Sequence, residues 1–205
     1  MSGEQTYKPR PRIEAFSDLI FGLALSIGAL ALIGQQLTSF EALMIALGLY
    51  GFSFLILVGV WLSYSNLTSI LPAETGNLIR INIVLLFLVS IEPFLFNQLF
   101  AEGMFYNVSI IYAVDLSSMF IILAFFNHAL ADEEKSHIPK NQLKTYKFAR
   151  NYSLLIAGVF LISTLPFFAT TYIIPLRVYV WILALALGSA RRIWGQAAKR
   201  TLKQP

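Results

Sequence analysis

Long apolar runs separated by short polar stretches dominate the sequence. A helix that crosses a bilayer needs roughly 20 mostly apolar residues, and by this criterion we expect six spans. The break between the last two rests only on Pro166, Pro175 and the threonines between them, because residues 152–176 carry no charge. The predicted spans cover residues 16–33, 42–63, 81–100, 105–130, 152–168 and 175–190. The pattern predicts an all-α integral membrane protein in which residues 1–205 form a single domain.

Composition supports this class and removes several kinds of chemistry. Hydrophobic residues make up 57% of the chain and charged residues 13%, whereas soluble domains carry about 25% charged residues. Without cysteine, the chain can form no disulfide, thiolate nucleophile, zinc–thiolate site or iron–sulfur cluster. We also find no zinc-protease motif, no Ser/His/Asp arrangement and no phosphate-binding loop. We therefore expect no enzyme, no catalytic residue, no cofactor and no metal site.

The basic residues predict how the helices are oriented. All but one of the fifteen Lys and Arg residues fall before the first span, between spans two and three, between spans four and five, or after the sixth; the exception is Arg177. Because Lys and Arg are enriched in cytoplasmic segments, we expect both termini to be cytoplasmic. The net charge of +4 then reflects topology, and we expect a lipid bilayer as the environment, with no nucleic-acid partner and no soluble partner.

Three carboxyl groups lie inside the predicted spans, where ionisable side chains are costly and often functional. Asp18 is equally well explained as a carboxylate at a helix start, with Ser17 as the cap. Glu92, which precedes Pro93, is better explained as an interfacial residue that ends a helix, and an interhelical hydrogen bond would satisfy Asp115. The three groups still leave open a proton-coupled secondary transporter that uses Asp18, Glu92 and Asp115.

The first span combines a polar motif with a row of bulky aliphatic residues. Leu23, Ile27 and Leu30 recur at helical spacing on one stripe, with Ser26 beside it. Such a stripe alone is typical of any transmembrane helix. The residues in front of it, R-I-E-A-F-S-D, are more distinctive and contain Arg12, Phe16, Ser17 and Asp18.

This R-x-x-x-F-S-D string resembles the signature of the transmembrane protein 175 family, which comprises the endolysosomal potassium channel and its prokaryotic relatives. Trp61, near the end of the second span, and Asn82, at the start of the third, also resemble family positions. The chain departs from the family after Trp61, where many prokaryotic members carry a histidine pair and this chain reads L-S-Y-S.

The resemblance implies a homotetrameric, potassium-permeable cation channel in the inner (plasma) membrane of a prokaryote. It implies that the first helix of each subunit lines a central pore, with Leu23, Ile27 and Leu30 on the pore wall and the hydroxyl of Ser26 near the constriction. Four copies of Leu23 would form an apolar ring that gates by dewetting. We therefore expect modest selectivity for K⁺ over Na⁺, with monovalent cations as the only ligands.

The same resemblance assigns a structural role to the motif. We expect its members to form a network that packs the first helix against the second and third, with the indole N–H of Trp61 as a candidate donor. The members of this network are Arg12, Phe16, Ser17, Asp18, Trp61 and Asn82.

Overall fold

The computed structural model describes residues 12–33, 39–69, 76–99, 105–131, 140–169 and 176–186. Every regular element in these ranges is helical, which confirms the all-α prediction. The elements are α1 (Arg12–Ala31), α2 (Phe40–Thr68), α3 (Gly76–Gln98), α4 (Phe105–Ala131), α5 (Lys140–Ile162), the short 3₁₀ turn η1 (Pro166–Ala169) and a final helix, Leu176–Ala186.

Three of the described helices are long and apolar enough to cross a membrane. They are Phe40–Thr68, Asn77–Gln98 and Tyr106–Ala131, and they contain the predicted second, third and fourth spans apart from residues 99, 100 and 105. Helices also occupy the other three predicted segments. α1 carries Glu14 and Asp18 in its first half, and Leu176–Ala186 is a shorter apolar helix. Six crossings therefore stay a prediction.

The fifth helix begins earlier than the apolar pattern predicts. α5 starts at Lys140 instead of residue 152, because a polar and basic sequence of good helix formers precedes its apolar half. At its other end, the regular helix stops at Ile162, and η1 begins at Pro166.

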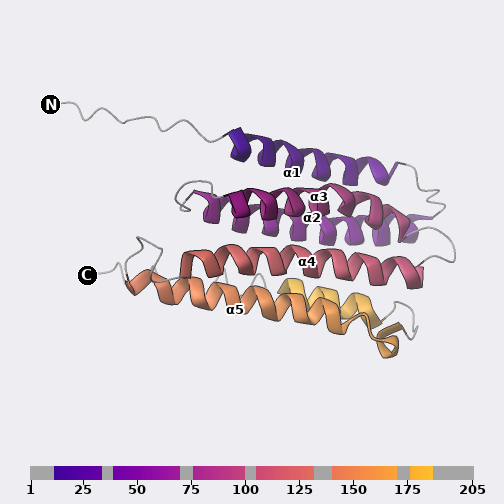
Figure 1. Cartoon of the computed structure of the whole chain (residues 1–205). Coiled ribbons are helices and arrows are strands. Elements are labelled where there is room, and N and C mark those ends of the chain that lie inside the picture. Colours follow the sequence, from indigo (N-terminus) through magenta and orange to yellow (C-terminus); the bar gives the residue numbers. More distant parts are fainter. Residues whose placement is uncertain are drawn as a thin grey trace, which may run out of the picture.

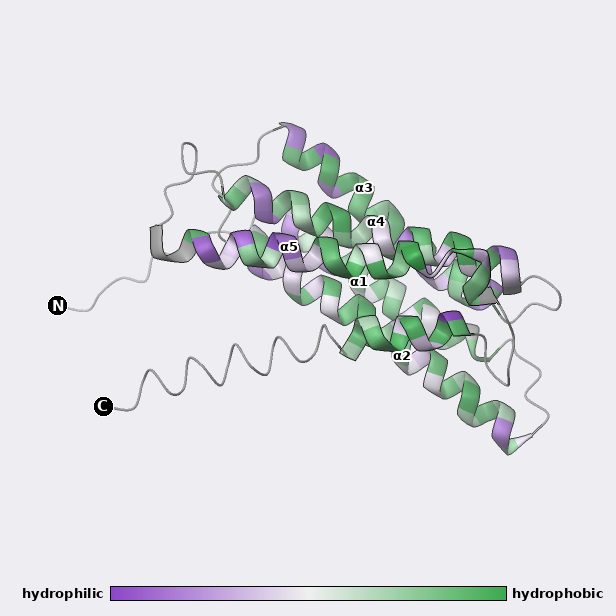
Figure 2. Cartoon of the chain, turned by 90° about the horizontal axis from the view of Figure 1, so that it is seen from below, coloured by the Kyte–Doolittle hydropathy of each residue, from purple (hydrophilic) through white to green (hydrophobic). Residues whose placement is uncertain are grey.

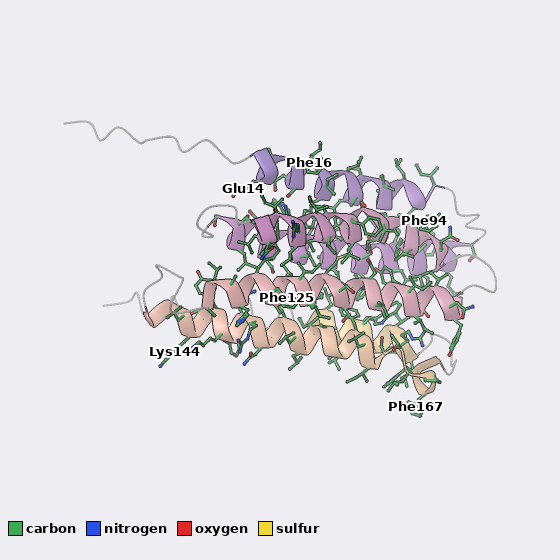
Figure 3. All side chains as sticks on the ribbon, viewed as in Figure 1. Glu14, Phe16, Phe94, Phe125, Lys144 and Phe167 are labelled. Carbon is green, nitrogen blue, oxygen red and sulfur yellow. The ribbon has the colours of Figure 1, made fainter. Side chains whose placement is uncertain are left out.

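The long helices run side by side in Figure 1, and the view turned by 90° shows that some of them are inclined to one another (Figure 2). α1 forms one edge of the bundle and packs on α2 and α3; α4 packs on α2 and α3 from the other side, and α5 covers α4. Hydrophobic positions occupy the middle of the helices, and hydrophilic ones gather toward their ends (Figure 2). Glu14 and Lys144 lie at the same end of the bundle (Figure 3).

The final short helix is anchored by two large buried side chains. The ring of Trp181 lies 5.2 Å from that of Tyr112 and 6.2 Å from that of Phe52, and its indole N–H donates to Ser163 Oγ at 2.9 Å. Arg177, in the first turn as predicted, is also buried. It donates to the carbonyl oxygens of residues 163, 106 and 164 and to the hydroxyl of Ser109. These contacts fix the return of the chain from α5 onto α4.

Candidate functional site on α1

α1 has one face buried in the bundle and one face exposed. Ser17, Phe21, Ala24 and Gly28 lie on the buried face. At Gly28, a Cβ would lie 3.4 Å from the ring of Tyr50, at van der Waals contact, so α1 lies close to α2 at this position.

The exposed face carries the predicted aliphatic stripe. Leu23 is 52% exposed, Ile27 43% and Leu30 62%, and we call these three residues the α1 row. Phe16 is also exposed and lies near the start of the helix (Figure 3). Ser26, next to the row, is exposed and donates to the carbonyl oxygen of Gly22 at 2.9 Å. The row therefore presents a continuous apolar surface that the described part of the subunit does not cover.

Behind the row, hydrogen bonds join α1 to α2 and α3. Ser17 Oγ and the hydroxyl of Tyr64 are 2.8 Å apart, and Asn82 Nδ2 donates to Ser17 Oγ at 3.4 Å. The indole N–H of Trp61 donates to Asp18 Oδ1 at 2.9 Å. The structure thus brings together four of the residues assigned to the motif network: Ser17, Asp18, Trp61 and Asn82.

The alternative interpretation of Ser17 and Asp18 as a helix cap is wrong. α1 begins at Arg12, so both residues lie in its second turn, where the backbone N–H groups already have partners within the helix. The side chain of Arg12 lies outside the part of the chain that the structure describes.

Tyr64 completes this network and was not predicted from the sequence. It is buried, and its ring lies 5.8 Å from that of Phe21 and 6.2 Å from that of Phe126. It belongs to the L-S-Y-S segment that departs from the family pattern. Its position three residues after Trp61 places both side chains on the same side of α2, and that spacing was the available signal.

A second polar cluster lies deeper in the bundle, around Glu92. Ser53 Oγ donates to Glu92 Oε1 at 2.5 Å, and the hydroxyl of Tyr112 donates to the same oxygen at 2.8 Å. The interpretation of Glu92 as an interfacial helix end is wrong, because the residue is fully buried and α3 continues past Pro93 to Gln98. The proline removes one N–H from the helix, while α2 and α4 supply hydrogen bonds to the neighbouring carboxyl group.

Asp115 lies one turn along α4 from Tyr112 and is also buried. Neither of its carboxyl oxygens has a hydrogen-bond partner, so the expected interhelical hydrogen bond is absent. Tyr112 also bonds to Glu92, so Asp115 and Glu92 lie in the same part of the bundle. Asp18 lies apart, because its partner Trp61 is eight residues from Ser53, or about 12 Å along α2. The three carboxyl groups of the transporter hypothesis therefore do not form one cluster.

Among the described residues, no group of three or more His, Cys, Asp or Glu side chains is placed to hold a metal ion. The two polar clusters are therefore built from hydrogen bonds and buried carboxyl groups.

Comparison with known proteins points to one family. Residues 12–93, which include α1 and α2 and most of α3, match the family model described as the endosomal/lysosomal potassium channel TMEM175. The fold resembles the crystal structure of a lysosomal potassium-selective channel TMEM175 homolog from Chamaesiphon minutus. The TM-score is 0.64 at 21% sequence identity, over 88% of this chain and 96% of that chain. No curated protein sequence matches this chain.

Proposed function

We propose that the chain is a member of the TMEM175 family, whose model matches residues 12–93, and that it forms a potassium-permeable cation channel whose pore is lined by α1. The family is one of potassium channels, which are not enzymes. The observation that carries the proposal is the α1 row, three bulky aliphatic side chains exposed on the helix that contains the family motif.

The proposed assembly is a homotetramer with one α1 from each subunit around a central axis. α1 lies at an edge of the subunit bundle (Figure 1), so its exposed face is available to other subunits, and the remaining helices can surround it. Four copies of Leu23 would close an apolar ring around the axis. A narrow apolar ring excludes water, and an ion that enters it must shed or rearrange its hydration shell.

The hydrogen bonds behind the row give a mechanism for setting the width of this ring. Ser17 and Asp18 are fixed to Tyr64 and Trp61 on α2, and Asn82 adds a contact from α3. A small tilt of α1 against these helices would widen or narrow the Leu23 ring and so wet or dry it. Discrimination then arises from the energy each cation needs to rearrange its water, which favours K⁺ modestly over Na⁺ and admits other monovalent cations.

The test is to measure reversal potentials with K⁺ on one side of a planar bilayer and Na⁺ on the other, using the purified protein. Leu23→Ala should raise the conductance and move the reversal potential toward zero, because it removes bulk from the ring. Leu155→Ala is a matched control, since Leu155 is 51% exposed but lies on α5, away from α1. Equal currents and reversal potentials in wild type and Leu23→Ala, with reconstitution verified, would refute a pore wall at Leu23.

A proton-coupled secondary transporter is the second candidate, and the burial of Glu92 and Asp115 without a basic partner among the described residues favours it. Flux measurements separate the two. A channel passes rapid passive currents that reverse with the ion gradient, whereas a transporter shows slow, saturable flux that depends on the proton gradient.

The membrane-spanning helices make the protein a multi-pass membrane protein. We place it in the inner (plasma) membrane of a prokaryote with both termini cytoplasmic. The described basic residues Arg80, Lys144, Lys147 and Arg150 support this orientation, because they lie within the first half of α3 and of α5, toward the end of the bundle where α1 also begins (Figure 1).

A further inference from the structure

The polar cluster around Glu92 contains more acceptors than donors. Glu92 is fully buried, and Asp115 is 5% exposed. Glu92 Oε1 accepts from Ser53 and Tyr112, but Glu92 Oε2, Asp115 Oδ1 and Asp115 Oδ2 have no hydrogen-bond partner. Ser53 and Tyr112 each have a single hydroxyl hydrogen, and both are already used on Oε1. We call Glu92 and Asp115 the buried carboxyl pair.

No cation compensates this pair within the described residues. Arg177 is the buried basic side chain among the described residues, and its guanidinium donates to Ser109 and to backbone carbonyls. The other titratable group that faces the pair is Tyr112, which donates to Glu92. On α1, Asp18 belongs to the separate network with Trp61, and α2 presents only the hydroxyl of Ser53.

Two buried carboxylates without a cation beside them would be very unfavourable in an apolar interior. An isolated buried charge costs far more than a buried neutral polar group, and a carboxyl group in this situation binds a proton instead. We infer that the buried carboxyl pair is a proton-binding site inside each subunit, with the proton held on Asp115. Asp115 is the acceptor of the proton because Glu92 already receives two hydrogen bonds that stabilise its charge, whereas Asp115 receives none.

Protonation of Asp115 has two consequences for the cluster. It turns one of the two buried charges into a neutral group, and it supplies an O–H donor to a cluster that has unfilled acceptors. The site lies between α3 and α4 and is separate from the α1 row. It therefore exists whether or not α1 lines a pore.

Infrared spectroscopy of the full chain in lipid vesicles tests the site directly. At neutral pH, exposed carboxyl groups are ionised, so a carboxylic-acid C=O band that shifts in D₂O reports a buried protonated carboxyl group. We expect this band in the wild type, expect it to be absent in Asp115→Asn, and expect it to persist at a shifted frequency in Glu92→Gln. Glu41→Gln, at an exposed carboxyl group on α2, should leave it unchanged.

The absence of a carboxylic-acid band in the wild type at neutral pH would overturn the inference, and so would its survival in Asp115→Asn. If Asp115→Asn does not fold, the same spectrum is recorded for the wild-type chain made with isotopically labelled aspartate. The band must then shift with the label, and a band that does not shift refutes the assignment. This experiment reads carboxyl groups and not currents, so a protein that conducts no ions but shows the band would contradict only the proposed channel.

Discussion

The hydrogen bond between Ser17 and Tyr64 should be the strongest neutral link that holds α1 in place. Tyr64→Phe keeps the ring and its contacts with Phe21 and Phe126 and removes only the hydroxyl. Ser17 is then left fully buried with the 3.4 Å contact from Asn82 in place of the 2.8 Å partner. Loss of a buried partner costs about 1–3 kcal/mol. We expect the free energy of unfolding to fall by about 1–2 kcal/mol.

Thermal unfolding in detergent micelles, followed by intrinsic fluorescence, measures this loss. A change of 1 kcal/mol moves the Tm of a chain of this size by about 2–4 °C, so Tyr64→Phe should lower it by about 2–8 °C. The double variant with Ser17→Ala should lose less than the sum of the two single losses, because both changes delete the same bond, and a coupling energy of about 1 kcal/mol is expected from the double-mutant cycle.

The matched control is Tyr179→Phe, which removes a hydroxyl from an exposed tyrosine and should leave the Tm unchanged. If Tyr64→Phe melts with the wild type, or if its effect and that of Ser17→Ala are fully additive, the two side chains do not share a stabilising bond. The account of how α1 is held against α2 would then be wrong.

Two further substitutions test the other contacts. Arg177→Lys should lower the free energy of unfolding by about 2–3 kcal/mol, since an ammonium cannot reach the same set of acceptors. Chemical denaturation in micelles measures this loss, and a denaturation midpoint equal to that of the wild type would show that the guanidinium geometry is unimportant. Trp61→Phe removes the donor to Asp18 and should lower the free energy of unfolding by about 1–2 kcal/mol. It should also change the open probability of single channels, and an unaltered open probability would show that this bond has no part in gating.

The sequence predicts the helical regions well and their ends less well. Lipid requires long apolar helices, so the runs that became α2, α3 and α4 are visible without any structure. The first half of α5 was missed because helix formation there rests on residues such as Lys140, Lys144 and Arg150, and a search for apolar runs does not detect a polar helix.

The motif indicates which polar residues of α1 contact other helices, but it does not predict all of their partners. Ser17 and Asp18 could be singled out because they stand in front of an apolar run. The spacing of Tyr64 from Trp61 indicates only that both lie on the same side of α2, because helical spacing gives the face of a residue but not the side chain opposite it on another helix. Glu92 was misjudged for a similar reason: α3 continues through Pro93 to Gln98, and the side chains that bond to the Glu92 carboxyl group lie on other helices.

The side chains of the α1 row make few packing contacts within their own subunit, since each is 43% exposed or more. The polar network and buried face behind them hold the helix in place without their help. Mutations at these three positions therefore leave the subunit fold largely intact, and natural selection can vary their size and polarity almost independently of stability. On the proposed pore wall, such changes would alter conductance and ion preference among relatives that keep the same motif and the same architecture.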